Sequence, residues 1–386
     1  MSQGSSQAGC RPLVFEDIPR AAWDRLVGRT ARPTPFSRWT FHRAWWDAYG
    51  PTAHDQYMVC LDGSAAGSAG EALTAIVPLM HRHEHEPQDE RTATVLRHRT
   101  PAGTRVRPDA KAVFFGASYH ADYATLLCPP EDLATVTRAL VGALAGPPDT
   151  SHGSQPWDVV DLRRLRTDDP SLAALEEAFQ ATAEREQWTV HREREDVCPV
   201  VIVSTGSSFE DYLAGLGKKS RHEIRRKLRR AQAAAPLSVE IAEPSQEAID
   251  GFVALHQKRF GSEGLFPETE GGERSRHFVR RLAELELAEG AGRQLHVARV
   301  RSGERLIFAA LAFDDGQTCY LYNAGMDPDA AELSPGISGT AEYLRDRIEA
   351  GRTRFDFMRG NEPYKYEWGA QDEPIERLLV LREQAA

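Results

Sequence analysis

The sequence predicts an α/β protein large enough for two domains. Strand-like and helix-like patterns alternate along its 386 residues, and the second half places three strand-like runs in succession between helical stretches. A chain of this length can bury one or two sizeable cores. Hydrophobic residues make up 41% and charged residues 27% of the chain, which is a balance typical of globular proteins.

The first half is expected to mix strands and helices. Residues 1–34 begin with a small, polar stretch, which predicts a flexible or partly ordered lead-in and not a signal peptide. Further on, Phe41, Trp45 and Tyr49 recur every four residues, which predicts a helix with a stripe that faces the core. Two apolar runs then flank the small, flexible stretch 63–72 and predict a hairpin.

The second half shows clearer element boundaries. Ser245 precedes one helical pattern and Gly261 follows it, while Gly351 ends the last one. The predicted helices cover residues 208–217, 217–232, 245–261, 273–290 and 334–351, and the predicted strands cover 237–244, 294–300, 305–313, 318–325, 354–358 and 375–381. Short turns join the three consecutive strands, which predicts an antiparallel meander. We place the domain boundary near residues 192–196 and expect one domain over 35–195 and a second over 196–386.

Charge and cysteine content exclude several classes of protein. The formal net charge of −10 argues against a general polyanion binder, and no apolar run approaches the roughly 20 residues of a membrane-spanning helix. The five cysteines are far apart and show no CxxC spacing, so we expect reduced thiols in a cytoplasmic protein. His81, His83 and His85 would share one face of a strand, but a solvent-facing strand end is a better interpretation than zinc. No metal is therefore expected.

Residues 217–232 form the most basic stretch of this acidic chain. Eight lysines and arginines stand there against one acid, Glu223, while Leu216, Ile224 and Leu228 form an apolar stripe at helical spacing. Like charges one turn apart cost about 0.2–0.5 kcal/mol per pair, and a bound anion would offset that cost. A solvated charged face is the alternative. The predicted phosphate contacts are Lys218, Lys219, Arg221 and Arg225.

Several stretches together resemble a known family. "SPGISG", "FDFMRGNEPYKYEWG" and "KKSRHEIRRKLRR" resemble the GNAT proteins described as cellulose-biosynthesis-type acetyltransferases, and the order of helices and strands is similar to that of GNAT acyltransferases. "PFSRWTFHRAWWDAYGP" and "YHADYATLL" extend the resemblance over residues 35–369. It implies two GNAT-like domains, each a mixed and mostly antiparallel sheet flanked by helices, with the active site in the second domain.

The resemblance also implies where a donor binds. GNAT enzymes usually hold the diphosphate of coenzyme A where the third meander strand meets a helix, because free amides and the helix dipole attract anions there. The predicted donor contacts are Tyr322, Asn323, Ser334, Gly336 and Gly339. The arginine or glutamine of the usual family pattern is missing from this sequence, and a simple helix N-cap is the alternative.

The stretch after the strand at residues 354–358 is predicted to carry the chemistry. Acyl transfer to an amine needs a base and donors that stabilise an oxyanion. Glu362 or Asp356 could be the base, Tyr364 could protonate the leaving group, and Lys365 could neutralise a phosphate or the oxyanion. Arg359 is a predicted substrate contact, and a salt bridge between it and Asp356 is the alternative.

We therefore expect an N-acyltransferase that moves an acyl group from acyl-CoA to an amine or hydroxyl of a small molecule, sugar or peptide. The first alternative is aminoacyl transfer from tRNA, because the family is distantly similar to the Fem transferases. In those proteins a helix start similar to Lys219-Ser220-Arg221 contacts a nucleotide diphosphate on the acceptor. The second alternative is a non-catalytic subunit that binds a phosphorylated glycan precursor.

Overall fold

The chain divides into two compact units. The computed structural model describes residues 9–50, 54–55, 57–61, 73–82, 106, 110–117, 119–147 and 156–382. Unit 1 comprises Met1–Pro87, His98–Asp196 and Pro374–Ala386, and unit 2 comprises Gln88–Arg97 and Val197–Glu373. The main division therefore falls beside residues 192–196, and the C-terminal strand returns to unit 1.

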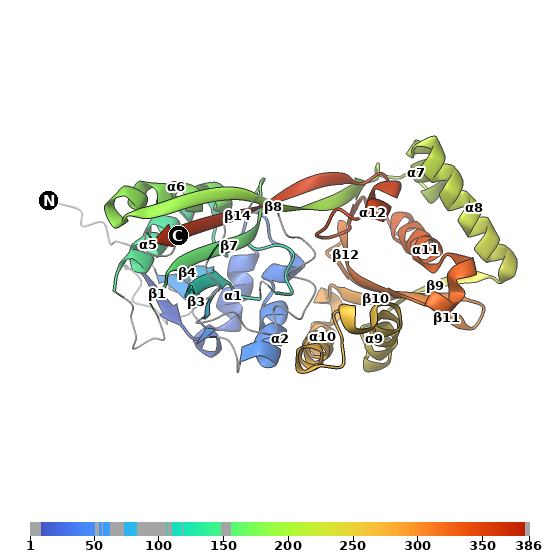
Figure 1. Ribbon diagram of the computed structural model, residues 1–386, viewed down its shortest axis with the longest axis horizontal. Helices are drawn as coiled ribbons and strands as arrows, with labels where there is room; N and C mark the ends of the chain where they lie inside the picture. The colour runs from blue at the N-terminus through green and yellow to red at the C-terminus, as the bar shows by residue number, and fades with distance from the viewer. Residues whose placement is uncertain are drawn as a thin grey trace. The chain divides into compact units, whose positions relative to one another are not determined.

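Over the described residues, unit 1 combines two sheets with helices (Figure 1). Its strands are β1 (Gly9–Leu13), β2 (His54–Asp55), β3 (Tyr57–Leu61), β4 (Leu73–Val77), β5 (Leu79–Arg82), β6 (Ala112–Phe115), β7 (Val159–Arg166), the first part of β8 (Trp188–Ile202) and most of β14 (Gln371–Arg382). Its helices are α1 (Arg20–Val27), α2 (Trp39–Tyr49), α5 (Leu133–Ala145) and α6 (Pro170–Glu186). One sheet has the order β1-β3-β4, and the other strands follow the order β2-β5-β6-β7-β14-β8. Strands β3 and β4 are antiparallel, which confirms the predicted hairpin pairing, while its loop at residues 63–72 lies outside the described residues.

Residues 9–34 lie in the segment that the sequence predicts to be flexible or partly ordered. From residue 9 onward they form β1 and α1, and the side chains of Phe15, Trp23 and Leu26 are buried in a core with Tyr57. Residues 9–34 are therefore an ordered part of unit 1. The small, polar start of the chain does not reveal that an aromatic core forms immediately after it.

Two of the five cysteines are paired, which corrects the expectation of reduced thiols. Cys10 on β1 and Cys60 on β3 are register partners, their Cα atoms are 4.1 Å apart, and a disulfide joins them. The spacing of 50 residues gave no signal of this pairing, because only strand register brings the two side chains together. Cys128, Cys198 and Cys319 are free and buried.

His81 is also placed differently from the prediction. It lies in β5, and its side chain is buried with 1% of its surface exposed, so it is not at a solvent-facing strand end. His83 and His85 lie outside the described residues. Among the residues that the structure describes, no cluster of three potential metal ligands forms.

Unit 2 is one mixed sheet with helices on both faces (Figure 1). Its strands are the last part of β8, β9 (Leu237–Ala242), β10 (Leu295–Ser302), β11 (Arg305–Asp314), β12 (Thr318–Met326) and β13 (Arg354–Asp356), in the order β8-β13-β12-β11-β10-β9. Its helices are α7 (Phe209–Gly215), α8 (Lys218–Ala234), α9 (Gln246–Phe260), α10 (Glu270–Ala288), α11 (Pro335–Glu349) and α12 (Pro363–Glu367). Helices α9 and α10 cover one face and α11 covers the other, with α8 packed against α11. The mixed α/β prediction is confirmed.

Local sequence explains most of the unit 2 helices. The Ser208 side chain accepts a hydrogen bond from Asp211 N–H at 3.1 Å and the Ser245 side chain accepts one from Ala248 N–H at 3.3 Å, so both serines cap the starts of α7 and α9. In α8, Ile224, Leu228 and Ala231 are buried at helical spacing. Of the described helices, none is long and apolar enough to cross a membrane.

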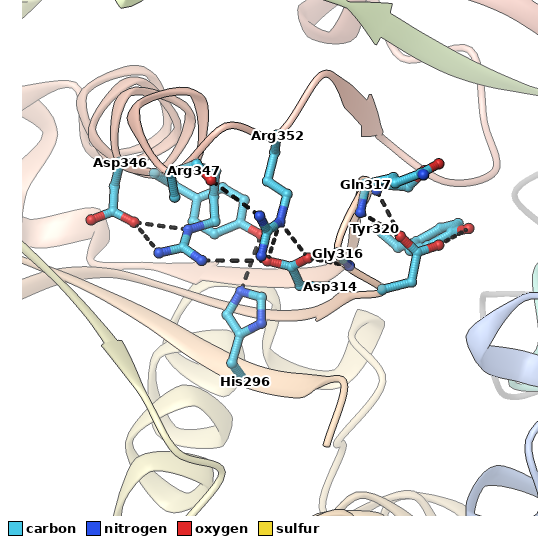
Figure 2. A network of polar contacts seen from close by, with 12 residues as sticks. His296, Asp314, Gly316, Gln317, Tyr320, Asp346, Arg347 and Arg352 are labelled. Atoms are coloured by element: carbon cyan, nitrogen blue, oxygen red, sulfur yellow. Dashed lines mark hydrogen bonds and ion pairs between the residues drawn. The ribbon is translucent and has the colours of Figure 1, made fainter. Parts of the chain in front are cut away.

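A polar network closes the end of the sheet where β11 turns into β12 (Figure 2). The Asp314 carboxylate accepts hydrogen bonds from Arg352 Nε at 2.7 and 2.9 Å and lies 3.4 Å from Arg347 Nη1. Nearby, His296 Nε2 lies 3.1 Å from Tyr343 Oη. We call these five residues the Asp314 network. Burial would raise the pKa of Asp314, but the Arg352 guanidinium and the Gly316 amide outweigh it and hold that pKa below its usual value.

Candidate active site

Strands β12 and β13 separate at one end of the unit 2 sheet. They pair in parallel at Tyr320↔Asp356, which is the last of three residue pairs, and β13 ends there. Strand β12 continues to Met326 and pairs only with β11 over this part of the described chain. Cys319 and Tyr320 are buried, whereas residues 321–324 are half-buried. The β13 side of β12 is therefore open from residue 321 onward.

A β-bulge lies in the opened part of β12. Leu311 pairs with Asn323 and Ala312 pairs with Leu321, so Tyr322 is the extra residue on β12. The Tyr322 ring packs edge-on against Phe313, with centroids 5.8 Å apart. Bulges locally interrupt a ladder and redirect backbone groups, and they are common beside active sites. The bulge and the separation of β12 from β13 leave this stretch of backbone without a strand partner on one side, where Ala324 N–H donates to the Asn323 side chain at 2.8 Å and an extended ligand could pair with the remaining groups.

Helix α11 begins beside this open edge, and an arginine from α8 reaches its first turn. Ser334 has a left-handed backbone with φ of 50°. Its side chain does not cap the helix but accepts a hydrogen bond from Arg230 Nη2 at 2.6 Å. The N–H groups of Ile337 and Ser338 both donate to the Ser334 carbonyl at 2.9 Å. Gly336 N–H has no partner among the described residues, so the site offers one free amide and one guanidinium.

The two glycines predicted to contact a donor differ in what surrounds them. A Cβ at Gly339 would lie 2.3 Å from Phe308 Cγ, so this glycine lets α11 pack closely on β11. A Cβ at Gly336 would meet only the flexible end of Met326, at 2.9 Å. The geometry thus explains Gly339 by packing, and only Gly336 lies where its backbone could contact a ligand.

Two of the four α8 cations predicted to bind phosphate have partners within the protein. Arg221 Nη1 donates to the carbonyls of Ala214 at 2.7 Å and Leu216 at 3.4 Å, at the end of α7. Arg225 pairs with Glu210 at 2.7 Å. Lys218 and Lys219 are exposed in the first turn of α8 and have no ion-pair partner in the described chain. The sequence favoured Arg221, but Arg230 is the cation that reaches α11.

Lys365 organises the loop that follows β13. It is 2% exposed, and its Nζ donates to the carbonyls of Met358 at 2.9 Å, Arg359 at 2.8 Å and Gly360 at 3.0 Å. An ammonium has three protons, so these three carbonyls use all of them. This geometry favours a structural role for Lys365 over the predicted contact with a phosphate or oxyanion.

Asp356 shapes the same loop at its start. Its side chain is 1% exposed, and Oδ1 accepts a hydrogen bond from Met358 N–H at 2.8 Å. Met358 has a φ of 59°, which is unusual for a residue with a side chain, and the bond to Asp356 supports that conformation. Asp356 is thus better placed to hold the loop than to accept a proton from a substrate.

Glu362 and Tyr364 are the predicted catalytic residues that solvent can reach. The Glu362 side chain is 40% exposed and lies 2.9 Å from Lys365 Nζ, and Tyr364 is 49% exposed. The Tyr364 ring meets Phe357 edge-on, with centroids 6.4 Å apart. Arg359 is half-buried in the same loop. All of them follow β13 directly, on the segment that leaves the sheet where β12 opens.

Charges also fix the segment that joins β12 to α11. Asp327 pairs with Lys258 of α9 at 2.5 Å and with Arg305 of β11 at 2.6 Å. Burial would raise the pKa of Asp327, but the two cations outweigh it and keep that pKa below its usual value. Asp327 therefore stays ionised and anchors the connection to the sheet.

Two residues that the sequence analysis did not single out are important here. A Cβ at Gly325 would lie 2.5 Å from His256 N, so this glycine lets α9 lie directly on β12. A glycine inside an otherwise strand-like pattern could have indicated this close approach. Arg230, by contrast, lies 104 residues from Ser334 in the chain, and no local signal connects them.

This arrangement can bind an extended acyl donor. The open edge of β12 can hydrogen-bond the amides of a linear ligand, the α11 start with Arg230 can hold a phosphate group, and Glu362 and Tyr364 can exchange protons with solvent and substrate.

Comparisons with known proteins identify one domain family and several similar folds. Residues 218–366 match the family model described as "Acetyltransferase (GNAT) domain". Among curated proteins, no sequence matches this chain. The structure is similar to the crystal structure of FemX, at 10% identity and a TM-score of 0.55, over 94% of this chain and 96% of that one. It is also similar to a conserved protein of unknown function from Bacteroides thetaiotaomicron VPI-5482, at 14% identity and a TM-score of 0.52, over 95% of this chain and 98% of that one. At these identities the likeness concerns the fold.

The match over residues 218–366 shows that the chain carries a GNAT-type N-acyltransferase domain.

Proposed function

We propose that the chain transfers an acyl group from an acyl-CoA to an amine or hydroxyl of a small molecule, sugar or peptide. The observation that carries this proposal is the open edge of β12, with its bulge at Tyr322 and the start of α11 beside it. The pantetheine arm of coenzyme A is linear and contains amides, so it can add to the edge of β12 as an extra strand would. Tyr322 and Asn323 would flank that arm.

The diphosphate of the donor would lie at the start of α11. Gly336 N–H and the Arg230 guanidinium are the two groups available to it there, and Arg230 supplies the cation that the usual family pattern places in the loop. The predicted contacts from Lys218, Lys219, Arg221, Arg225 and Arg359 remain predictions, as does a donor contact from Ser334.

The acyl-transfer step would use groups on the loop after β13. The acceptor nitrogen or oxygen attacks the thioester carbonyl, and Glu362 takes the proton that the acceptor loses, directly or through one water. The C–S bond then breaks, and Tyr364 protonates the departing thiolate.

A panel of ligands in a thermal-unfolding assay tests the donor. Binding stabilises the folded state by about 2.7 kcal/mol when the ligand is at 100 times its dissociation constant. We expect acyl-CoA and coenzyme A to raise the melting temperature, and pantetheine without phosphates to do so less. No response to any coenzyme A species would contradict the proposal.

Arg230 and Ser334 offer a matched pair of variants for the same assay. Arg230→Gln removes the cation, whereas Ser334→Ala breaks the same hydrogen bond and keeps the cation. We expect Arg230→Gln to weaken coenzyme A binding by at least tenfold and Ser334→Ala to change it less than threefold. Equal effects would assign Arg230 a purely structural role.

Aminoacyl transfer from tRNA is the second candidate. The absence of the usual arginine or glutamine before α11 favours it, and the fold is similar to that of FemX. Stabilisation by aminoacyl-tRNA without any response to coenzyme A would select this candidate. A non-catalytic subunit for a phosphorylated glycan precursor predicts that Glu362→Gln and Asp356→Asn leave cellular function intact.

Membership of the cellulose-biosynthesis-type group and a cytoplasmic location also remain proposals. The Cys10–Cys60 disulfide weighs against the cytoplasm, because disulfides are rare in reducing compartments.

A further inference from the structure

The exposed side of α8 carries cations that the proposed donor site does not use. We define the α8 outward face as Lys218, Lys219, Arg226 and Arg229, which are all exposed. At about 100° of rotation per residue, these four side chains fall within about 100° of one another around the helix axis. Ile224, Leu228 and Ala231 are buried on the opposite side. The face is therefore a continuous basic stripe that no other part of the described chain covers.

The charges on this face are poorly compensated within the protein. Only Arg226 has a carboxylate partner among the described residues, Glu223, at 2.7 Å. Arg229 Nε instead lies 3.3 Å from the Arg225 carbonyl. Gly217 at the N-cap provides no side-chain cap, and the first turn of α8 has no acid. Cations at the positive end of a helix dipole are unfavourable, so an anionic partner would stabilise this end of α8.

The length of the face indicates a partner with several negative groups. Lys218 and Arg229 are eleven residues apart, which corresponds to about 17 Å along the helix. A single diphosphate cannot reach both ends. The partner must present anionic groups along a line or across a surface.

The composition of α8 favours lipid head groups over nucleic acid. Four to eight lysines and arginines on an amphipathic helix are typical of binding to anionic lipids. Residues 218–234 contain no aromatic side chain on which bases could stack, and the pI of about 5.8 is far from that of basic nucleic-acid-binding domains. The face has no large exposed apolar side chain, so it would contact head groups without inserting into the acyl chains.

We propose that the α8 outward face docks the protein electrostatically on a bilayer that carries anionic lipids. This inference goes beyond the proposed transferase activity and does not depend on the identity of the donor. It assigns the cations of α8 two tasks: Arg230 faces the start of α11, and the outward face meets the membrane surface.

Co-sedimentation of the full chain with vesicles tests this proposal. We would compare vesicles of phosphatidylcholine alone with vesicles of phosphatidylcholine and phosphatidylglycerol in a 7:3 ratio. The test variant changes Lys218, Lys219, Arg226 and Arg229 to Gln. The matched control changes four exposed arginines of ion pairs elsewhere to Gln, namely Arg20, Arg29, Arg185 and Arg280. Both variants lose four positive charges, and circular dichroism checks that both are folded.

We expect the wild type and the control to bind only the anionic vesicles and to be released as salt rises towards 0.5 M, because salt screens such contacts. The test variant should bind at least tenfold more weakly, and the double variant Lys218→Gln/Lys219→Gln at least threefold more weakly. Wild-type binding to neither vesicle, or equal losses in test variant and control, would overturn the proposal. Salt-sensitive binding to an RNA duplex without vesicle binding would also overturn it and would assign the face to nucleic acid.

Discussion

Strand β12 and helix α11 share two ends, and the polar groups at one end are satisfied within the protein more fully than those at the other. At the start of β12, the Asp314 network links β11, the end of α11 and the segment before β13 through charged hydrogen bonds (Figure 2). At the other end, β12 has lost its pairing with β13, contains a bulge, and faces an α11 start with a single free amide. Strand β12 thus runs from the closed end to the open end, and α11 runs back from the open end to the closed end. The closed end holds the fold together, and the open end leaves hydrogen-bonding groups for a ligand.

Removing the central carboxylate of the closed end should have the largest effect. Asp314→Ala leaves the Arg352 guanidinium without its carboxylate partner, whereas Arg347 keeps Asp346, and breaking a buried pair in this way typically costs about 3–5 kcal/mol. We expect the free energy of unfolding, measured by urea denaturation, to fall by that amount. Asp250→Ala is the control, because Asp250 and Arg280 form an exposed pair that contributes about 1 kcal/mol or less. Similar losses for both variants would mean that the Asp314 network contributes little to the free energy of unfolding.

Adding a methyl group under α11 should have the next largest effect. In Gly339→Ala the new Cβ would lie 2.3 Å from Phe308 Cγ, and overpacking of this kind costs about 1–3 kcal/mol. Gly336→Ala is the control at the open end, because its Cβ meets only the flexible Met326 thioether. We expect thermal unfolding to show a clear loss for Gly339→Ala and a small one for Gly336→Ala. A larger loss of stability for Gly336→Ala than for Gly339→Ala would show that α11 does not pack against Phe308 as described.

A change at the open end should affect the reaction and leave stability nearly unchanged. Glu362→Gln keeps the shape of the side chain and removes the proposed base, which should lower the acyl-transfer rate at least 100-fold. The side chain is 40% exposed, so we expect the free energy of unfolding to change by about 1 kcal/mol or less. An unchanged rate in the folded variant would remove Glu362 from the mechanism. Glu367→Gln, an exposed neighbour on α12, is the matched control.

Mild acid should weaken the closed end by a smaller amount. Burial lowers the pKa of His296 to about 4, whereas the unfolded chain binds that proton near pH 6.5. The stabilisation from keeping His296 neutral is complete above pH 6.5 and is lost as the pH falls towards 4. We expect His296 to account for a loss of about 2 kcal/mol between pH 7 and pH 5.

The His296→Gln variant separates this contribution from those of other groups. His42 and His120 in unit 1 are also buried, and burial lowers the pKa of each to about 3, so they add to the loss in the wild type. Denaturation curves at several pH values should show a smaller loss for His296→Gln than for the wild type. Identical curves would mean that His296 takes up its proton in the folded state.

Local patterns were sufficient to predict most of unit 2. The capping serines at positions 208 and 245 and the apolar stripe of α8 all lie where the sequence indicated, because each depends on neighbours within a few residues. The short helix α12 was not predicted. Its five residues follow Pro363, and so short a helix shows no periodicity.

The candidate site was predictable only in part. The sequence indicated that the segments around Ser334 and Glu362 matter, because helix starts and polar clusters after strands have recognisable compositions. It could not show that the Lys365 ammonium donates to three backbone carbonyls, or that Gly339 is needed for packing against Phe308. Those facts depend on which atoms lie opposite one another.

By itself, the sequence determined most of the order of helices and strands in the second half, the mixed α/β class and the basic character of residues 217–232, because periodicity, capping and charge are local properties. Only the tertiary structure decided how those cations are used. Packing of α8 against α11 brings Arg230 to Ser334, directs Arg221 to the end of α7, and leaves Lys218 and Lys219 facing outward. Register likewise joins Cys10 to Cys60 across 50 residues of chain. Contacts between distant residues follow from how elements pack and pair, and local sequence does not encode them.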